Sequence, residues 1–214
     1  MSSWCARPAG DAVTAWTSDL KPFRSSFLPL EATASAAYNQ FVYRDGRQGD
    51  EVRGLLFDRG VGEFADRYTS AMVEDGEVAF FISALLAPDL RLCRMRSALA
   101  IAKGGFFGDD PALHGRMQLA GTTVAPVEDG DCYISRVAVS PRCRGQGRAG
   151  LLLERAQELA AAGGATRLIL EVARGNEAGL NLYRKHGFEL VDQREVGDPA
   201  TGRSLALIHM AKAI

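Results

Sequence analysis

One short segment constrains this chain more than any other: a glycine-rich turn between a strand-like and a helix-like pattern. It occupies residues 139–150 and contains glycine at positions 145, 147 and 150. Glycines let backbone N–H groups approach a ligand closely, and the N-terminus of the following helix adds partial positive charge. This geometry suits a phosphate group, whereas a plain surface turn is the alternative. The local positive charge comes from three arginines: Arg142, Arg144 and Arg148.

The same glycine spacing matches the G-x-G-x-x-G fingerprint of dinucleotide-binding proteins, with Glu171 as the acidic residue on the next strand. Two features count against that interpretation. Residues 140–144 separate the strand from the glycines, and only 64 of the 214 residues follow Gly150. An NAD(P)-binding oxidoreductase is therefore the alternative function.

The elements around the turn alternate between strand and helix. Asp75–Gly76 predicts a tight turn in a β-hairpin over residues 68–84. Asn176 is expected to cap a short helix that ends before Gly187. The pattern predicts strands at 133–139, 167–172, 188–196 and 205–210, and helices at 149–162 and 177–186. This order indicates an α/β or α+β layer fold.

The first half of the chain is less regular. Residues 1–48 are expected to form a weakly defined lead-in packed on the core, and residues 49–214 the domain itself. Helical spacing over residues 51–67 is interrupted by Gly60 and Gly62, which predicts a break or two short helices. Asp89 is expected to cap a helix reaching Lys103, and the glycine-rich residues 104–131 are expected to be loop-like.

Composition excludes several classes of protein. The 25 Lys and Arg residues nearly cancel the 26 Asp and Glu residues, giving a net charge of -1 and no global basic field for a nucleic acid. The longest apolar run, residues 79–87, is too short for a bilayer span, and residues 1–20 do not resemble a secretory signal. The four scattered cysteines and three histidines lack zinc-site spacing. We expect a soluble, cytoplasmic protein without a metal, a membrane or a nucleic acid partner.

Two ordered motifs resemble the GNAT superfamily of acetyl-CoA-dependent N-acetyltransferases. The first is Arg142-Cys-Arg-Gly-Gln-Gly147, which is similar to the family's Q/R-x-x-G-x-G/A between a strand and a helix. The second runs from Asn176 through Leu182-Tyr183 to Gly187-Phe188. The resemblance covers about residues 50–210 and implies a mixed, mostly antiparallel twisted sheet flanked by helices. An insertion over about residues 86–131 precedes the signature strand and departs from the family pattern.

The resemblance implies a site for acetyl-CoA. The strand backbone would pair with the pantetheine arm, and the turn would take the diphosphate, with Arg142 and Arg144 as the expected charged partners. The implied binding set is Val137, Ala138, Val139, Arg142, Arg144, Gly145, Gln146, Gly147, Arg148, Ala149, Gly150, Asn176 and Tyr183. Plain core packing is the alternative for the valines, and helix capping for Asn176.

Tyr183 is the candidate catalytic acid for the departing thiolate, and packing in the core is its alternative. Asn176 and Tyr183 are seven residues apart, so they can lie on one face of the helix. No general base stands out, although Asp131, Tyr133 and Ser135 lie along the signature strand. Three further residues are given lesser roles: His186 as a helix cap, His114 as a solvated side chain, and Cys143 as an improbable nucleophile whose neighbouring arginines could lower its pKa.

These motifs predict an enzyme that moves an acetyl group directly from acetyl-CoA to a primary amine on a small molecule, peptide or protein. A non-catalytic acyl-CoA-binding module is a further alternative. The insertion is expected to shape the acceptor pocket, with Phe106 and Phe107 as apolar walls, or else to form a dimer contact or an aromatic plug. A homodimer is accordingly among the partners considered.

Overall fold

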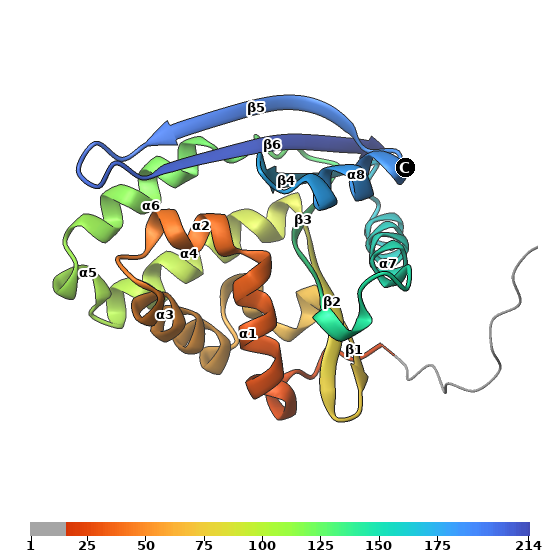
Figure 1. The fold of residues 1–214 in the computed structure, drawn as a ribbon, viewed down its shortest axis with the longest axis horizontal. Coiled ribbons are helices and arrows are strands. Elements are labelled where there is room, and N and C mark those ends of the chain that lie inside the picture. Colours follow the sequence, from red (N-terminus) through yellow and green to blue (C-terminus); the bar gives the residue numbers. More distant parts are fainter. Residues whose placement is uncertain (1–15) are drawn as a thin grey trace, which may run out of the picture.

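The computed structural model describes residues 16–214, and its centre is one six-stranded sheet (Figure 1). The strands lie in the order β1-β2-β3-β4-β6-β5, and β3 and β4 are the only parallel neighbours among them. Their bounds are β1 Thr69–Glu74, β2 Glu77–Leu86, β3 Asp131–Val139, β4 Arg167–Ala173, β5 Glu189–Gly197 and β6 Ser204–Ala213. The predicted mixed, mostly antiparallel sheet is confirmed. A dinucleotide-binding domain needs a mostly parallel sheet, so the strand directions speak against that alternative.

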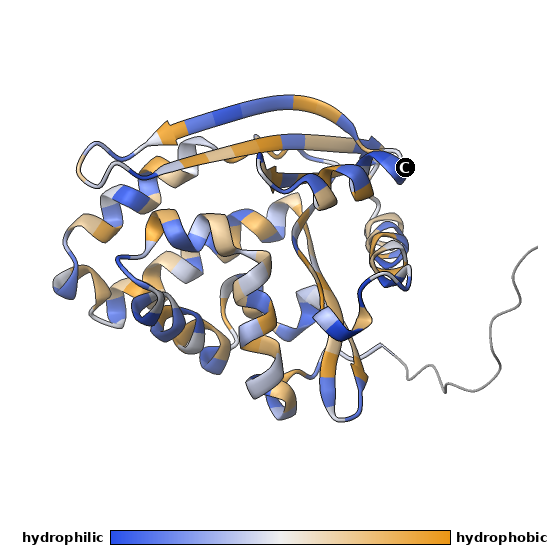
Figure 2. Cartoon of the chain, viewed as in Figure 1, coloured by the Kyte–Doolittle hydropathy of each residue, from blue (hydrophilic) through white to orange (hydrophobic). Residues whose placement is uncertain are grey.

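Helices cover both faces of the sheet. One face carries α7 (Arg148–Ala162), and α8 (Glu177–Lys185) lies near it, whereas α1 to α6 gather on the other side (Figure 1). Strand β2 is buried between the two layers and is mostly hydrophobic (Figure 2). Because successive strand residues point to opposite faces, Phe80 packs in the core beneath α7 and Phe81 packs in the core beneath α1.

The hairpin and the elements that follow the turn agree with the sequence-based expectation. Asp75 and Gly76 both adopt positive φ, at 54° and 76°, as a tight hairpin turn requires. Helix α7 begins one residue earlier than expected, and Asn176 caps α8 by accepting a hydrogen bond from the Gly179 amide at 2.9 Å. No helix within residues 16–214 has both the length and the apolar character that crossing a bilayer requires.

The N-terminal region is more ordered than the sequence suggested. Residues 1–15 of the expected lead-in lie outside the described residues. They include most of the N-terminal segment that does not resemble a secretory signal. The chain then forms α1 (Arg24–Ala34), α2 (Ala36–Val42) and α3 (Gly46–Arg59). Helix α1 contains Pro29, which masks it in the sequence, but Phe27 anchors it between Phe57 and Phe81, with ring centroids 5.4 and 4.7 Å away.

The break expected at Gly60 and Gly62 is confirmed. Helix α3 is continuous to Arg59 and ends at Gly60, which adopts the left-handed conformation with φ 57°. Two single-turn 3-10 helices then lead into the hairpin, at Gly62–Phe64 and Asp66–Tyr68. Gly62 has φ 65°, so the second glycine serves the connection.

Two expectations for the insertion were wrong. Helix α4 runs from Ala87 to Lys103, and Asp89 does not cap it, because Asp89 lies in the first turn and accepts a hydrogen bond from the Tyr68 hydroxyl at 3.0 Å. Residues 104–131 are not loop-like throughout, since they contain α5 (Phe106–Asp109) and α6 (Ala112–Thr122). Tertiary contacts explain α6: Arg116 forms a buried ion pair with Asp110 and donates to the Val42 carbonyl at 2.6 Å.

Candidate active site

The sheet opens between β3 and β4. These strands pair only from Asp131 to Ile134 on β3, opposite Arg167 to Leu170 on β4. Beyond that point β3 continues to Val139 and pairs with β2 alone, while β4 continues along β6. The backbone edge of residues 136–139 that faces β4 therefore has no strand partner in the described part of the chain. An irregularity in the β2–β3 register lies beside Ser135, next to the point where β3 and β4 separate.

The glycine-rich turn begins where this free edge ends. Pro141–Cys143 forms a 3-10 turn after β3, and α7 begins at Arg148 with Gly147 as its N-cap. Gly145 and Gly147 both have φ 74°, a conformation that glycine adopts without strain. Within residues 16–214, the backbone N–H groups of residues 145–149 donate no hydrogen bond. Five successive amides without a protein partner at a helix N-terminus have the geometry to bind an anion.

The three arginines of the turn do not have equal freedom. Arg142 donates to the Glu74 carbonyl at 2.9 Å and lies 3.3 Å from Glu77, so it is held at the hairpin. Arg148 pairs with Glu74 at 3.3 Å, and its guanidinium lies over the Phe80 ring. Arg144 is exposed, and within residues 16–214 its guanidinium bonds only to the Val139 carbonyl, at 3.3 Å. Arg144 is therefore the turn's most available cation.

The other residues of the predicted binding set lie in the same strand–turn–helix unit. Val137 and Val139 pack against the core beneath α7, and Ala138 packs on the opposite face. Gln146 donates to the Arg142 carbonyl at 3.1 Å, which closes the turn. Ala149 lies in the first turn of α7. A Cβ atom on Gly150 would come within 3.1 Å of the His186 ring, so glycine permits α7 to meet the end of α8.

Tyr183 and Asn176 lie on α8 but in different surroundings. The Tyr183 side chain is buried against Phe188, and burial raises its pKa to about 12. Its hydroxyl has no hydrogen-bond partner among residues 16–214. Asn176 is exposed, and its oxygen is used by the helix cap. Within the described residues the structure records no contact between these two side chains. That both bind the same ligand therefore stays a prediction.

A cavity of about 370 Å³ lies on the face of the sheet away from α7. Tyr133 and Ser135 of β3 line it, as do Glu171 and Ala173 of β4, so it reaches the point where the strands separate. Asp131 does not line it, because that carboxylate binds Arg167. The insertion contributes seven residues to its wall: Arg94, Ser97, Ala98, Ile101, Met117, Gly121 and Val124.

Phe106 and Phe107 line neither of the two cavities described here, so their role as apolar walls of an acceptor pocket stays a prediction. They pack at the edge of the core under α1 instead. Helix formation at residues 106–109 turns both rings toward neighbouring helices, and Phe107 meets the exposed His114 ring edge-on at 5.3 Å. The expectation of a solvated His114 is confirmed.

Glu171 is the functional candidate that the sequence reasoning missed. Its carboxylate accepts hydrogen bonds from the Tyr133 hydroxyl and from the Ala125 amide, the latter at 2.7 Å. Burial raises its pKa above the usual value for a glutamate, although both hydrogen bonds oppose the shift. The available signal was a single acidic residue after the apolar run of residues 168–170 in β4, and the sequence analysis assigned it to the dinucleotide fingerprint.

A buried charge network forms another wall of this cavity. Arg136 bonds to Glu31 and Glu63, each at 2.6 Å, and lies over the Phe64 ring. Arg53 lies 3.5 Å from the second Glu31 oxygen. Buried charges need such partners, and this network balances its own. It orders the N-terminal helices against β3.

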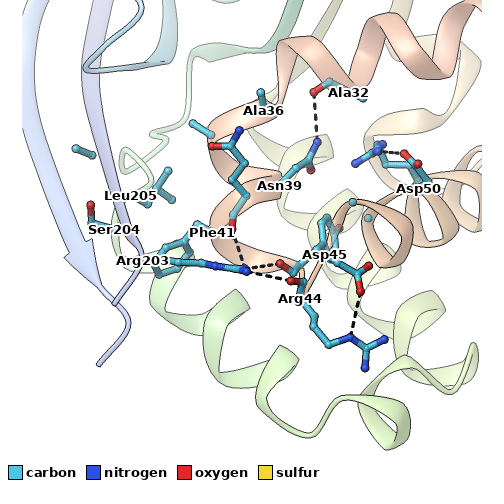
Figure 3. A pocket seen from close by; sticks show the side chains of 17 residues that line it. Ala32, Ala36, Asn39, Phe41, Arg44, Asp45, Asp50, Arg203, Ser204 and Leu205 are labelled. Atoms are coloured by element: carbon cyan, nitrogen blue, oxygen red, sulfur yellow. Dashed lines mark hydrogen bonds and ion pairs between the residues drawn. The ribbon is translucent and has the colours of Figure 1, made fainter. Parts of the chain in front are cut away.

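A second, larger cavity of about 650 Å³ lies between α2, the start of α3 and the β5–β6 hairpin (Figure 3). None of its lining residues belongs to β3 or β4, so it is remote from the free edge and the turn. Arg203 of the hairpin donates to the carbonyl oxygens of Gln40, Tyr43 and Arg44 at 2.7 to 3.0 Å. Those bonds give hydrogen-bond donors to carbonyl oxygens at the end of α2 and hold the hairpin against that helix (Figure 3).

Cys143 does not have the environment of a nucleophile. Burial and the neighbouring Glu74 raise the pKa of its thiol. Arg142 lowers that pKa, as expected, and Arg148 does too, but the two arginines do not overcome burial and Glu74. His186 follows α8 as its C-cap residue, as expected, while its ring packs on Gly150.

Comparison with known proteins agrees with this geometry. An acetyltransferase crystal structure, 18% identical, covers 90% of this chain and 97% of its own with a TM-score of 0.59. An N-acetyltransferase from Staphylococcus aureus Mu50, also 18% identical, covers 85% and 95% with a TM-score of 0.56. A ribosomal-protein-alanine N-acetyltransferase from Brucella melitensis, 21% identical, covers 87% and 94% with a TM-score of 0.50. Comparison with curated protein sequences finds no match.

These structural similarities establish the fold: a sheet opened between two parallel strands, with a glycine-rich turn at the opening. The sequence adds the family. The family model described as "Acetyltransferase (GNAT) family" matches residues 71–188, which include most of the hairpin, the signature strand, the turn and α8. The chain belongs to the GNAT family of acetyltransferases.

Proposed function

We propose that this protein takes an acetyl group from acetyl-CoA and transfers it directly to a primary amine. The free amides of residues 145–149 are the observation that carries the proposal. Five successive N–H groups without a protein partner at the start of a helix can all donate to one anion, which also meets the positive end of the helix dipole. The diphosphate of coenzyme A fits that requirement, and Arg144 is the cation available beside it.

The free edge of β3 supports the rest of the donor site. Pantetheine contains two amide groups in an extended chain, and an extended amide chain can pair with an exposed strand edge. Residues 136–139 offer such an edge on the side facing β4. A chain that enters at the turn and follows this edge ends beside Ser135, where the strands separate and the 370 Å³ cavity begins. The acetyl group would therefore lie at the inner end of that cavity.

Tyr183 is proposed to assist departure of the thiolate. With its pKa raised to about 12, the phenol is fully protonated at neutral pH. Full proton transfer to a thiolate of pKa about 8.5 would cost about 5 kcal/mol. Tyr183 thus acts mainly as a hydrogen-bond donor to the developing charge, a role that needs no complete transfer.

Direct transfer is favoured over a covalent enzyme intermediate. Cys143 has a raised pKa and lies against the hairpin at Glu74, 3.6 Å from its carboxylate. In direct transfer the amine nitrogen forms a bond to the acetyl carbon, the carbon–sulfur bond breaks, and the thiol leaves after gaining a proton. The ammonium form of the acceptor loses two protons overall, one to activate the nitrogen and one after attack.

Titration calorimetry with acetyl-CoA and with NADH tests the donor. We expect acetyl-CoA to bind and NADH not to bind. Arg144→Ala should weaken acetyl-CoA binding by about 1 to 3 kcal/mol, as for a charge-assisted hydrogen bond. Arg142→Ala is the matched control and should have a smaller effect, because hairpin groups already hold that guanidinium. Binding of NADH alone would contradict the proposal.

Thiol release over a panel of amines tests catalysis. The proposal expects acceptor-dependent release of free coenzyme A by the wild-type protein. Tight acetyl-CoA binding without release for any amine would instead identify a non-catalytic acyl-CoA-binding module.

A further inference from the structure

We propose that the acceptor is a small amine that also carries a carboxylate, with Glu171 receiving the proton of its ammonium group and Arg94 binding its carboxylate. This inference rests on the function proposed above. It concerns the 370 Å³ cavity, whose volume lies at the lower end of the range for small-molecule sites.

The position of Glu171 is the first step. The last residue of β4 that pairs with β3 is Leu170, opposite Ile134. Glu171 is the next residue, and Ser135 is its counterpart on β3, so both lie where the strands separate. Both also line the cavity. Glu171 therefore lies at the junction of the proposed thioester position and the acceptor space, where a base must be in order to reach the attacking nitrogen.

The surroundings of Glu171 suit a proton acceptor. Tyr133 on β3 and the Ala125 amide donate to its carboxylate, His209 on β6 is its register partner, and Arg94 on α4 acts on it at longer range. His209 uses Nε2 to contact the Thr123 carbonyl at 2.6 Å. Burial outweighs these groups and raises the pKa of Glu171, which brings a carboxylate closer to the range useful for general-base catalysis.

Arg94 is the second step. The cavity is lined by three arginines, and two have carboxylate partners: Arg136 with Glu31 and Glu63, and Arg53 with Glu31. Arg94 forms no ion pair within the described residues. Its guanidinium lies over the Tyr133 ring, 5.4 Å from the ring centroid. An arginine without a carboxylate partner at a cavity wall fits a carboxylate-bearing ligand, since the guanidinium offers paired donors.

Tyr133 links the two ends of the proposed site. Its hydroxyl bonds to Glu171, and its ring faces Arg94. The proton-accepting group thus lies at the hydroxyl of this side chain, and the carboxylate-binding group lies over the face of its ring. An acceptor whose amine and carboxylate are a few bonds apart can reach both.

The proposed step balances as follows. The ammonium group gives one proton to the Glu171 carboxylate, and the freed nitrogen lone pair attacks the acetyl carbon. The carbon–nitrogen bond forms and the carbon–sulfur bond breaks, with the electron pair leaving on sulfur. Sulfur gains a proton with assistance from Tyr183, and the second nitrogen proton leaves to solvent. Glu171 then releases its proton to solvent, which restores the carboxylate.

A panel of matched amines tests the carboxylate. The panel contains ω-amino acids of increasing length, each beside the alkylamine that lacks the carboxylate, with thiol release from acetyl-CoA as the signal. We expect kcat/KM for the best amino acid to exceed that of its alkylamine by roughly 10- to 100-fold. Arg94→Ala should remove this preference, and Arg94→Lys should retain part of it. Arg96→Ala, on the same helix but outside the cavity lining, is the control and should keep the full preference.

Glu171→Gln tests the base. We expect kcat to fall roughly 100- to 10,000-fold and the low-pH fall in the wild-type rate, which protonation of Glu171 causes, to disappear. Calorimetry should show unchanged acetyl-CoA affinity, which separates this loss from misfolding. A variant that keeps the wild-type pH profile would overturn the role of Glu171.

The outcomes separate this inference from the function on which it rests. Absence of acetyl-CoA binding would defeat the proposed function itself. If acetyl-CoA binds but alkylamines react as fast as the amino acids, or no amino acid in the panel reacts, the carboxylate-bearing acceptor is overturned while donor binding stands.

Discussion

Two regions of this molecule are built by different means. What we call the donor half, after its proposed role, comprises β3, the turn, α7, β4 and α8 over residues 131–188, and its proposed contacts come mainly from the backbone. What we call the acceptor half, again after its proposed role, comprises residues 24–64 and 87–124, and it shapes its cavity with side chains from α1, α2, α3, α4 and α6. The donor half needs particular main-chain conformations, such as φ 74° at Gly145 and Gly147. The acceptor half needs buried charges to meet across elements, such as Arg136 with Glu31.

This difference governs how each half responds to change. A backbone site fails when a single residue cannot adopt the required φ angle, and neighbouring side chains matter less. A side-chain site fails when one buried partner is removed, because the remaining charge has no compensation. Four substitutions test this contrast, and they are given in order of decreasing expected effect.

Arg116→Leu should give the largest loss, in the acceptor half. Arg116 and Asp110 form a buried ion pair, so removing the arginine leaves an uncompensated carboxylate and should cost about 3 to 5 kcal/mol of unfolding free energy. Urea unfolding measures this. Arg47→Ala, which breaks an exposed pair with Glu51, is the control and should cost less than about 1 kcal/mol. Equal effects would show that burial does not set the strength of these pairs.

The same pair predicts a pH dependence. Burial would raise the pKa of Asp110, but hydrogen bonds from Arg116 and Gln48 outweigh it and hold the pKa below its usual value. A carboxylate with a lowered folded-state pKa contributes stability above its unfolded pKa of about 4, and that contribution is lost as the pH falls below it. The wild type should therefore lose more stability than Arg116→Leu between pH 5 and about pH 3. Parallel pH profiles would contradict this assignment.

Gly147→Ala should give the next largest loss, in the donor half. Alanine in the left-handed conformation costs about 1 to 2 kcal/mol, and no atom crowds the added methyl group. Acetyl-CoA affinity should fall with stability, because the turn amides lose their arrangement. Gly115→Ala is the same substitution within α6 and should instead stabilise the protein by about 0.5 to 1 kcal/mol. Opposite signs in urea unfolding would confirm the contrast, and equal signs would contradict it.

Tyr183→Phe should lower kcat about tenfold, equivalent to about 1.4 kcal/mol, and leave acetyl-CoA affinity nearly unchanged. The modest size follows from the raised pKa, which makes Tyr183 a hydrogen-bond donor rather than a strong acid. Steady-state thiol release measures the change. A loss above about a thousandfold would instead indicate full proton transfer. An unchanged kcat would show that Tyr183 serves only to pack the core.

Asn176→Ala should give the smallest loss, about 1 kcal/mol of stability, because the cap on the Gly179 amide disappears. Asn176→Ser should keep that cap. If Asn176 also contacts coenzyme A, the serine variant will weaken acetyl-CoA binding by about 0.5 to 1.5 kcal/mol. We expect this weakening, and an unchanged dissociation constant would limit Asn176 to capping.

Sequence reasoning succeeded where local conformation dictates residue type. The Asp75–Gly76 hairpin turn, the Asn176 cap and the glycines of the turn each impose a backbone requirement that few residues meet. It failed where structure depends on distant partners. Helix α6 depends on the hydrogen bond from Arg116 to the carbonyl of Val42, 74 positions away. No local sequence pattern predicts that bond. Glu171 acquires its surroundings only when β3, β4 and β6 assemble.

Amide hydrogen exchange with and without coenzyme A tests whether the β3 edge and the turn bind the donor. We predict that the ligand protects amides of the free β3 edge at residues 136–139 and of the turn at residues 145–149. Amides lining the 650 Å³ cavity between α2 and the β5–β6 hairpin should exchange as before. Protection at that larger cavity with no change along β3 and the turn would contradict the account.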